Sequence, residues 1–231
     1  MPRGVDLDAE VRRVDPDRWL ASRFIADQGA RADVIALYAF DHELARASAV
    51  TSNDTAAEIR LTWWREALEE IYCGEGVRGH PVAESLATVA RARALPRAPF
   101  EAMIDARIRV LGRSRLETDD ALAWAAGAES SAARLAAQIL DPAGDSGLAA
   151  PAGVVWGLVL LRRSGKARGP EFDHSLRQAL GEARRAARRL SSLAFPAALV
   201  AALARADLRS PSPSQLEKRA RLAWSALTGQ L

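Results

Sequence analysis

The stretch from Ala30 to Val50 reads ARADVIALYAFDHELARASAV. Its apolar residues recur three, four and seven positions apart, as at Val34, Leu37, Tyr38 and Leu44. This spacing predicts an amphipathic helix with one buried face. Elsewhere in the chain, no run alternates apolar and polar residues with the β-branched enrichment typical of strands. We therefore expect an all-α fold.

Working outward from this helix, the same spacing predicts about eight to ten helices in one domain that spans residues 1–231. Ser52-Asn53-Asp54 ends the first long helix, and Thr55 with Glu58 forms a capping box for the next. We expect residues 1–15 to be a loosely ordered tail and Ser210–Ser214 to be a linker within the fold. The other expected helices cover residues 18–28, 55–72, 81–95, 100–111, 116–140, 153–163, 172–194, 196–206 and 214–227.

Composition excludes several classes of protein. Of the 231 residues, 49% are hydrophobic and 26% are charged, which is typical of a globular domain and not of a disordered, collagen-like or multi-span membrane chain. The net charge of +3 argues against a nucleic-acid partner. A single cysteine, Cys73, allows no internal disulfide or Cys-cluster metal site. Because there is no leader or bilayer-spanning stretch, we expect a cytoplasmic protein, either free or resting on the inner membrane.

Five short motifs follow one another in a distinctive order. They are Ser22-Arg-Phe, Tyr38-Ala-Phe40, Trp63-Trp64-Arg65, His80-Pro-Val82 and the Gly-rich start of the segment Gly153–Arg163. Together they resemble the squalene/phytoene synthase family over most of the chain. The resemblance implies a helical bundle of the isoprenoid (terpenoid) synthase type. In that family, Mg²⁺ held by two Asp-rich motifs promotes head-to-head condensation of two prenyl diphosphates.

This sequence departs from the family at the metal ligands. With the Tyr-Ala-Phe motifs aligned, the family's carboxylates fall on residues that are not acidic. No Asp or Glu lies between Asp145 and Glu171, where the second motif belongs. Magnesium requires hard oxygen ligands, so this chain lacks the carboxylates on which the family reaction depends. The affected positions are Ala45, Arg46 and Ala49 for the first motif, Leu160, Leu161 and Arg162 for the second, and Val110 for a third acidic position.

Two functions remain open. In the first, the chain is a non-catalytic binding or assembly factor without a cofactor. The runs 39–46 and 128–140 resemble a divergent branch of the family, which includes a mitochondrial assembly factor for respiratory complex I. In the second, the chain is an active Mg²⁺-dependent prenyltransferase whose carboxylates have shifted to Asp41, Glu43 and Asp105. The second function requires these three side chains to converge on one cavity.

Binding and membrane contact have candidate residues of their own. Tyr38, Trp64 and Trp156 could line a tunnel for an isoprenoid lipid, or they could be core residues. Arg162 and Arg163 could pair with a diphosphate head without metal, or they could be solvated residues at a helix end. Arg65 is a further candidate for substrate binding. On the segment 176–190, a basic stripe lies opposite an apolar one, which fits either contact with an anionic membrane or a solvated face. The stripe comprises Arg184, Arg185, Arg188 and Arg189. A membrane protein complex is a further expected partner.

Overall fold

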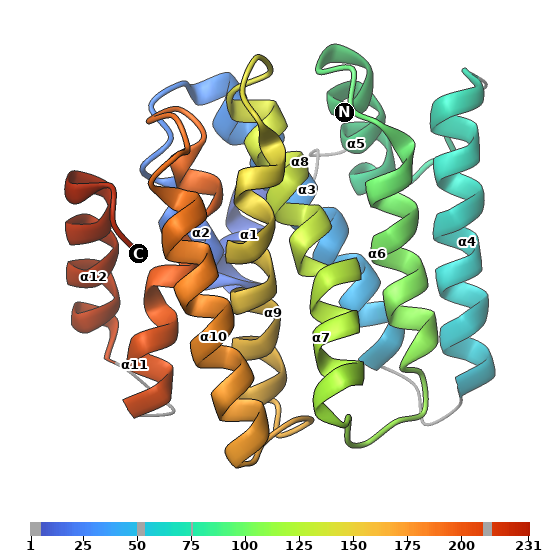
Figure 1. Ribbon diagram of the computed structural model, residues 1–231. Coiled ribbons are helices and arrows are strands. Elements are labelled where there is room, and N and C mark those ends of the chain that lie inside the picture. Colours follow the sequence, from blue (N-terminus) through green and yellow to red (C-terminus); the bar gives the residue numbers. More distant parts are fainter. Residues whose placement is uncertain (1–5, 50–53, 75, 210–213) are drawn as a thin grey trace.

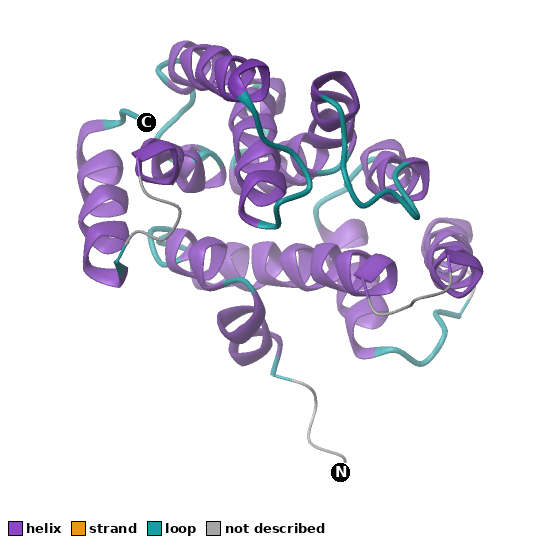
Figure 2. Cartoon of the chain, turned by 90° about the horizontal axis from the view of Figure 1, so that it is seen from below, coloured by secondary structure: helices purple, strands orange, loops and turns teal. Residues whose placement is uncertain are grey.

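The computed structural model describes residues 6–49, 54–74, 76–209 and 214–231 (Figure 1). These residues form twelve α-helices and three short 3₁₀-helices, and none of them is in a strand. Figure 2 accordingly shows helices joined by loops. The all-α prediction is confirmed, with slightly more helices than expected.

The helices follow the sequence in a simple order. The longest, α3 (Gln28–Ala49), includes residues 30–49, whose apolar spacing predicts a helix. The others are α1 (Leu7–Val14), α2 (Pro16–Ser22), α4 (Asp54–Cys73), α5 (Pro81–Ala92), α6 (Arg97–Arg109), α7 (Thr118–Gly127), α8 (Glu129–Leu140), α9 (Ala150–Arg163), α10 (Pro170–Ala187), α11 (Ala204–Arg209) and α12 (Gln215–Thr228). The 3₁₀-helices are η1 (Ser146–Ala149), η2 (Phe195–Ala197) and η3 (Leu199–Leu203).

Two clusters of buried apolar side chains hold the bundle together. The first surrounds α3, which packs against α1, α4, α5, α6 and α8. The second surrounds α9, which packs against α7, α8, α10 and η3. Helices α8 and α9 lie in contact between the two clusters. The polar site described below lies among helices that belong to both clusters.

The expected helix over residues 116–140 is divided in two. It breaks at Ala128, between the end of α7 and the start of α8. The cause is tertiary packing, because α7 ends against α6: a Cβ on Gly127 would lie 2.8 Å from the Cβ of Ala106. The break makes Glu129 the first residue of a new helix.

The remaining differences concern the ends of the chain and its short elements. Residues 7–14 belong to α1 instead of a loose tail, and the first five residues of that expected tail lie outside the described residues. Residues 196–206 are mostly 3₁₀-helix. Helix α4 begins at Asp54, one residue before the expected capping box, and residues 50–53 and 210–213 lie outside the described part. No described helix is long and apolar enough to cross a membrane.

Candidate functional site

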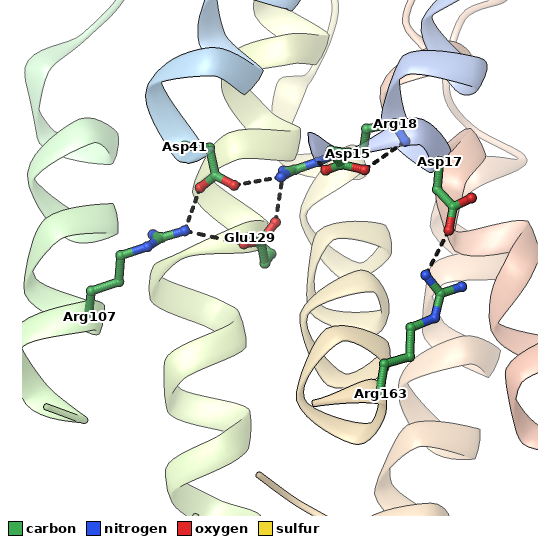
Figure 3. A network of polar contacts seen from close by, with 7 residues as sticks. All are labelled: Asp15, Asp17, Arg18, Asp41, Arg107, Glu129 and Arg163. Atoms are coloured by element: carbon green, nitrogen blue, oxygen red, sulfur yellow. Dashed lines mark hydrogen bonds and ion pairs between the residues drawn. The ribbon is translucent and has the colours of Figure 1, made fainter. Parts of the chain in front are cut away.

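A network of ion pairs is buried where α2, α3, α6 and α8 meet (Figure 3). The Arg18 guanidinium donates to Asp41 at 2.6 Å and to Glu129 at 2.9 Å. Arg107 donates to the other oxygen of Asp41 at 2.6 Å and lies 3.5 Å from Glu129. All four residues are at most 5% exposed. Four helices are therefore joined by charged groups within the core.

Local structure explains how each group reaches the network. Asp15 caps α2 by accepting from the Arg18 backbone N–H at 3.0 Å, and it also accepts from the Arg18 side chain at 2.5 Å. Asp41 follows the buried residue Phe40 on α3. Glu129 sits at the N-terminus of α8, where the helix dipole favours a carboxylate. The break at Ala128 therefore places an acid opposite two arginines.

The network contains three carboxylates and only two guanidiniums. Burial raises the pKa of Asp41, but Arg107 and Arg18 outweigh this effect and hold it below its usual value. Burial and the nearby Asp41 charge raise the pKa of Glu129 to about 7. Glu129 is thus the surplus acid, and its proton neutralises the network near neutral pH.

A second network lies beside the first and joins the ends of the chain. The Arg163 guanidinium on α9 donates to Asp17 at 2.7 Å and to Asp207 at 2.7 and 2.9 Å. Lys218 on α12 donates to Asp17 at 2.8 Å. Burial lowers the pKa of Arg163, but its bonds to Asp207 and Asp17 outweigh this effect and raise it. Here two cations balance two carboxylates.

Both networks form part of the wall of one cavity of about 460 Å³. Much of the rest of the wall is aromatic or aliphatic, and these side chains come from α3, α7, α9, the end of α6 and the junction of α1 and α2. A ligand here would meet both a charged end and an apolar wall. The apolar lining residues are Val14, Pro16, Ala45, Val110, Trp124, Trp156, Leu160 and Leu161.

The polar groups of the cavity lining that have no partner among the described residues can all donate hydrogen bonds. The side chains of Lys166 and His42 line the cavity and form no hydrogen bond or ion pair with any described residue. Arg107 Nε and Trp156 Nε1 are buried and also lack a partner. Three of these four groups act only as donors, and histidine can donate. The cavity therefore suits a ligand that supplies acceptors or negative charge.

The residues of this cavity do not fit a magnesium cluster. All four carboxylates that line it, Asp15, Asp17, Asp41 and Glu129, already accept hydrogen bonds from arginine or lysine. Among the described residues, no group of three or more His, Cys, Asp or Glu is placed to hold a metal ion. Four positions where the resemblance would put carboxylates line the cavity as apolar residues: Ala45, Val110, Leu160 and Leu161.

The three shifted carboxylates proposed from the sequence do not come together. Asp41 lies in the buried network. Glu43 pairs with Arg46 at 2.6 Å and lines a different hollow. Asp105 is more than half exposed and pairs with Arg65 at 2.5 Å. The three carboxylates thus lie in three different places, and each pairs with different arginines.

The candidate binding residues are also dispersed. Trp156 lines the cavity, with the Arg163 guanidinium 5.0 Å from the centre of its ring. Tyr38 is buried beneath Arg18, and burial raises its pKa above the usual range. Trp64 lines the separate hollow with Glu43, in edge-to-face contact with Phe40. Arg162 pairs with Asp173 on α10 and is not part of the cavity wall.

Comparison with known proteins identifies the family. A sequence model described as squalene/phytoene synthase matches residues 11–166, which is more than half of the chain. The chain belongs to the squalene/phytoene synthase family. The matched range includes the whole buried network and most of the cavity wall.

Solved structures show that this family member has the isoprenoid synthase fold. The chain is similar to squalene synthase HpnC from Alicyclobacillus acidocaldarius, with 15% identity and a TM-score of 0.68 over 97% of this chain and 93% of that one. It is also similar to a dehydrosqualene synthase solved with a ligand, with 14% identity and a TM-score of 0.69 over 94% and 93% of the two chains. No curated protein matches the sequence.

Sequence reasoning missed most of the polar site. Arg18 and Glu129 lie 111 positions apart and Arg107 and Asp41 lie 66 apart, and arginine and glutamate are ordinary residues on helix surfaces. One usable signal was present: Asp15 directly precedes Pro16, a pattern that marks the start of a helix. Nothing local distinguishes a buried arginine from a solvated one.

Proposed function

We propose that this family member is a non-catalytic binding and assembly factor for a respiratory membrane complex, and that its cavity holds an anionic isoprenoid amphiphile without metal. One observation carries the proposal. The carboxylates of the cavity wall are bonded to cationic side chains, while the four expected metal-ligand positions that line the cavity are apolar. The carboxylate oxygens that could bind magnesium thus already bind arginine and lysine.

The ligand class follows from the two ends of the cavity. An isoprenoid chain suits a wall of Trp156, Leu160 and Val110, because apolar surface is removed from water on binding. A phosphate or carboxylate head suits the side chain of Lys166, which lines the cavity and has no partner among the described residues. The proposed role in assembly has a separate support. The runs 39–46 and 128–140 resemble the divergent branch of the family, which includes an assembly factor for respiratory complex I.

Ligand binding is tested with farnesyl diphosphate as the probe. The proposal expects the dissociation constant measured by calorimetry to be the same in EDTA and in Mg²⁺. Lys166→Gln should weaken binding about tenfold, because one charge-assisted bond is lost. The matched control is Arg168→Gln, which removes an exposed cation two residues away that does not line the cavity. Binding that requires Mg²⁺, or equal weakening in both variants, would overturn the proposal for the cavity.

The assembly role is tested in cells. Deletion of the gene in its natural host should reduce the amount of assembled respiratory complex I on native gels, and the wild-type chain should restore it. A variant with the cavity filled, Leu160→Trp, should fold but fail to restore assembly. Unchanged assembly in the deletion strain would contradict the role.

An active Mg²⁺-dependent prenyltransferase is the other function considered. It requires acids that converge, whereas Asp41, Glu43 and Asp105 each pair with a separate arginine. Peripheral contact with the inner membrane belongs to the favoured proposal, because a membrane complex is the partner.

A further inference from the structure

We propose that α12, together with the end of α10, forms a docking surface for the face of an anionic lipid bilayer. The apolar part, called here the α12 stripe, consists of Leu216, Ala220, Ala223, Trp224 and Leu227. The basic part is a group of arginines on α10 and α11. This surface is distinct from the cavity, so the inference does not depend on the cavity ligand.

The α12 stripe exposes large apolar side chains on one side of one helix. Leu216 is 78% exposed, Trp224 is 69% exposed and Leu227 is 86% exposed. At 3.6 residues per turn, these three side chains fall within an arc of about 80°. The opposite side of α12 buries Leu222 and Ser225 against the bundle. The helix therefore packs inward by one face and leaves a second apolar face in water.

The position of α12 leaves that face open. Helix α12 packs on η3 and α2 and lies at the outer edge of the bundle (Figure 1). Exposed single apolar residues are ordinary, but an aligned stripe containing tryptophan and leucine is typical of helices that lie in a membrane interface. Tryptophan favours that interface because its ring is apolar and its N–H is polar.

A cluster of arginines borders the α12 stripe. Arg184 on α10 donates to the main-chain oxygen of Leu231 at 2.8 Å, and its Nη2 is buried without a partner. Burial lowers the pKa of Arg184, and the charges of Arg205 and Arg188 lower it further. Neither Arg188 nor Arg205 forms an ion pair with any described residue. Among the described residues, no Asp or Glu side chain pairs with Arg184, Arg188 or Arg205, so positive charge is gathered here.

The apolar and basic parts meet at one hollow. Arg188 and Leu227 both line a depression of about 680 Å³ between the end of α10 and the end of α12. Leu190 and Phe195 form part of its wall. An acyl chain and an anionic head group could thus contact the protein side by side.

Charge complementarity favours a bilayer over a second copy of the chain. In a symmetric dimer, this face would meet itself, so that the unpaired arginines would approach one another and repel. Acidic phospholipids carry the opposite charge, and each arginine near such a surface strengthens binding about fivefold. The α12 stripe then adds burial of apolar surface at the same place.

The first test is sedimentation with vesicles of phosphatidylcholine, with and without 30% phosphatidylglycerol. The wild-type chain should bind the acidic vesicles. Leu216→Gln combined with Trp224→Gln should reduce binding at least tenfold. The matched control is Phe24→Gln combined with Ile59→Gln, two exposed apolar residues elsewhere on the bundle, and it should leave binding unchanged.

The second test reverses charge. Arg188→Glu combined with Arg205→Glu should reduce binding to acidic vesicles roughly thirtyfold or more. The control, Arg60→Glu combined with Arg91→Glu, makes the same change in net charge on exposed residues of α4 and α5. Equal loss in the control would show nonspecific attraction and overturn the proposal.

Two other results would also overturn it. One is a wild-type chain that does not sediment with acidic vesicles, and the other is a dimer in light scattering that the α12 variant converts to a monomer. Farnesyl diphosphate binding without vesicles should be unchanged in every variant. Loss of vesicle binding with intact ligand binding therefore separates this surface from the function proposed for the cavity.

Discussion

At the scale of single residues, Glu129 and Arg107 show how finely the buried network is balanced. Arg18 and Arg107 together hold Asp41 as a carboxylate, which leaves Glu129 as the acid that gains a proton near neutral pH. Removing either arginine leaves a carboxylate in the core without its partner, which is far more unfavourable than losing a pair at the surface.

Glu129 should make stability depend on pH. Its pKa rises from the ordinary 4.5 to about 7 in the folded chain, so the folded state keeps a proton that the unfolded state has lost. The Glu129 contribution to the free energy of unfolding is therefore full below pH 4.5 and falls as the pH rises to about 7. We expect a loss of roughly 3 kcal/mol across this window.

Glu129→Gln keeps the shape of the side chain and cannot ionise. Urea unfolding of this variant between pH 4.5 and 7 should show a smaller decline in stability than the wild type. Parallel curves for the two proteins would show that Glu129 does not titrate in this range.

Arg107→Met should destabilise the fold by about 3 kcal/mol or more, because Asp41 would lose one of its two buried partners. The matched control is Arg113→Met. Arg113 also pairs with an aspartate, Asp120, but the two side chains are 44% and 38% exposed. The control should change stability by less than about 1 kcal/mol, as measured by urea unfolding. Equal effects would mean that Arg107 is not buried with its acid.

At the scale of helices, the contact between α8 and α9 positions the network. A Cβ on Gly153 would lie 2.4 Å from the carbonyl oxygen of Glu129 and 2.5 Å from the Cα of Ser130. The two backbones therefore touch directly behind Glu129. Glycine is the residue that allows this approach.

Gly153→Ala should destabilise the protein by about 2 kcal/mol or more, because backbone atoms have to move. Gly181→Ala provides the control within another helix. There the new Cβ would meet only the end of the Arg185 side chain, at 3.6 Å, so the protein should gain up to about 1 kcal/mol from better helix propensity. Thermal unfolding measures both changes, and opposite signs are expected. Destabilisation by both would argue against the α8–α9 contact.

The helices were predictable from sequence where local spacing alone determines them. The expected helix over residues 30–50 corresponds to α3 (Gln28–Ala49), and that over 100–111 corresponds to α6 (Arg97–Arg109). The break at Ala128 was not predictable from local spacing, because it lies where Gly127 packs against Ala106 of the preceding helix, α6. Glu129 is the first residue after that break, so its part in the buried network was not predictable from sequence either.

At the scale of the whole molecule, the bundle holds a cavity whose wall combines ion-paired side chains with apolar ones. The apolar residues Ala45, Val110, Leu160 and Leu161 were named from motif spacing, and all four line one cavity. The arginines that bond to its carboxylates could be found only from the fold. A chain with this arrangement should hold an anionic amphiphile but not ionise a diphosphate through Mg²⁺.

The central claim is therefore that the cavity binds without catalysing prenyl transfer. The most direct measurement is diphosphate release from farnesyl and geranylgeranyl diphosphate by the purified chain in the presence of Mg²⁺. We predict no release above background, under conditions where calorimetry shows farnesyl diphosphate bound equally well in EDTA. Release that is lost when Asp41 and Glu43 are both changed to alanine would contradict the account, because it would show a working metal site built on these acids.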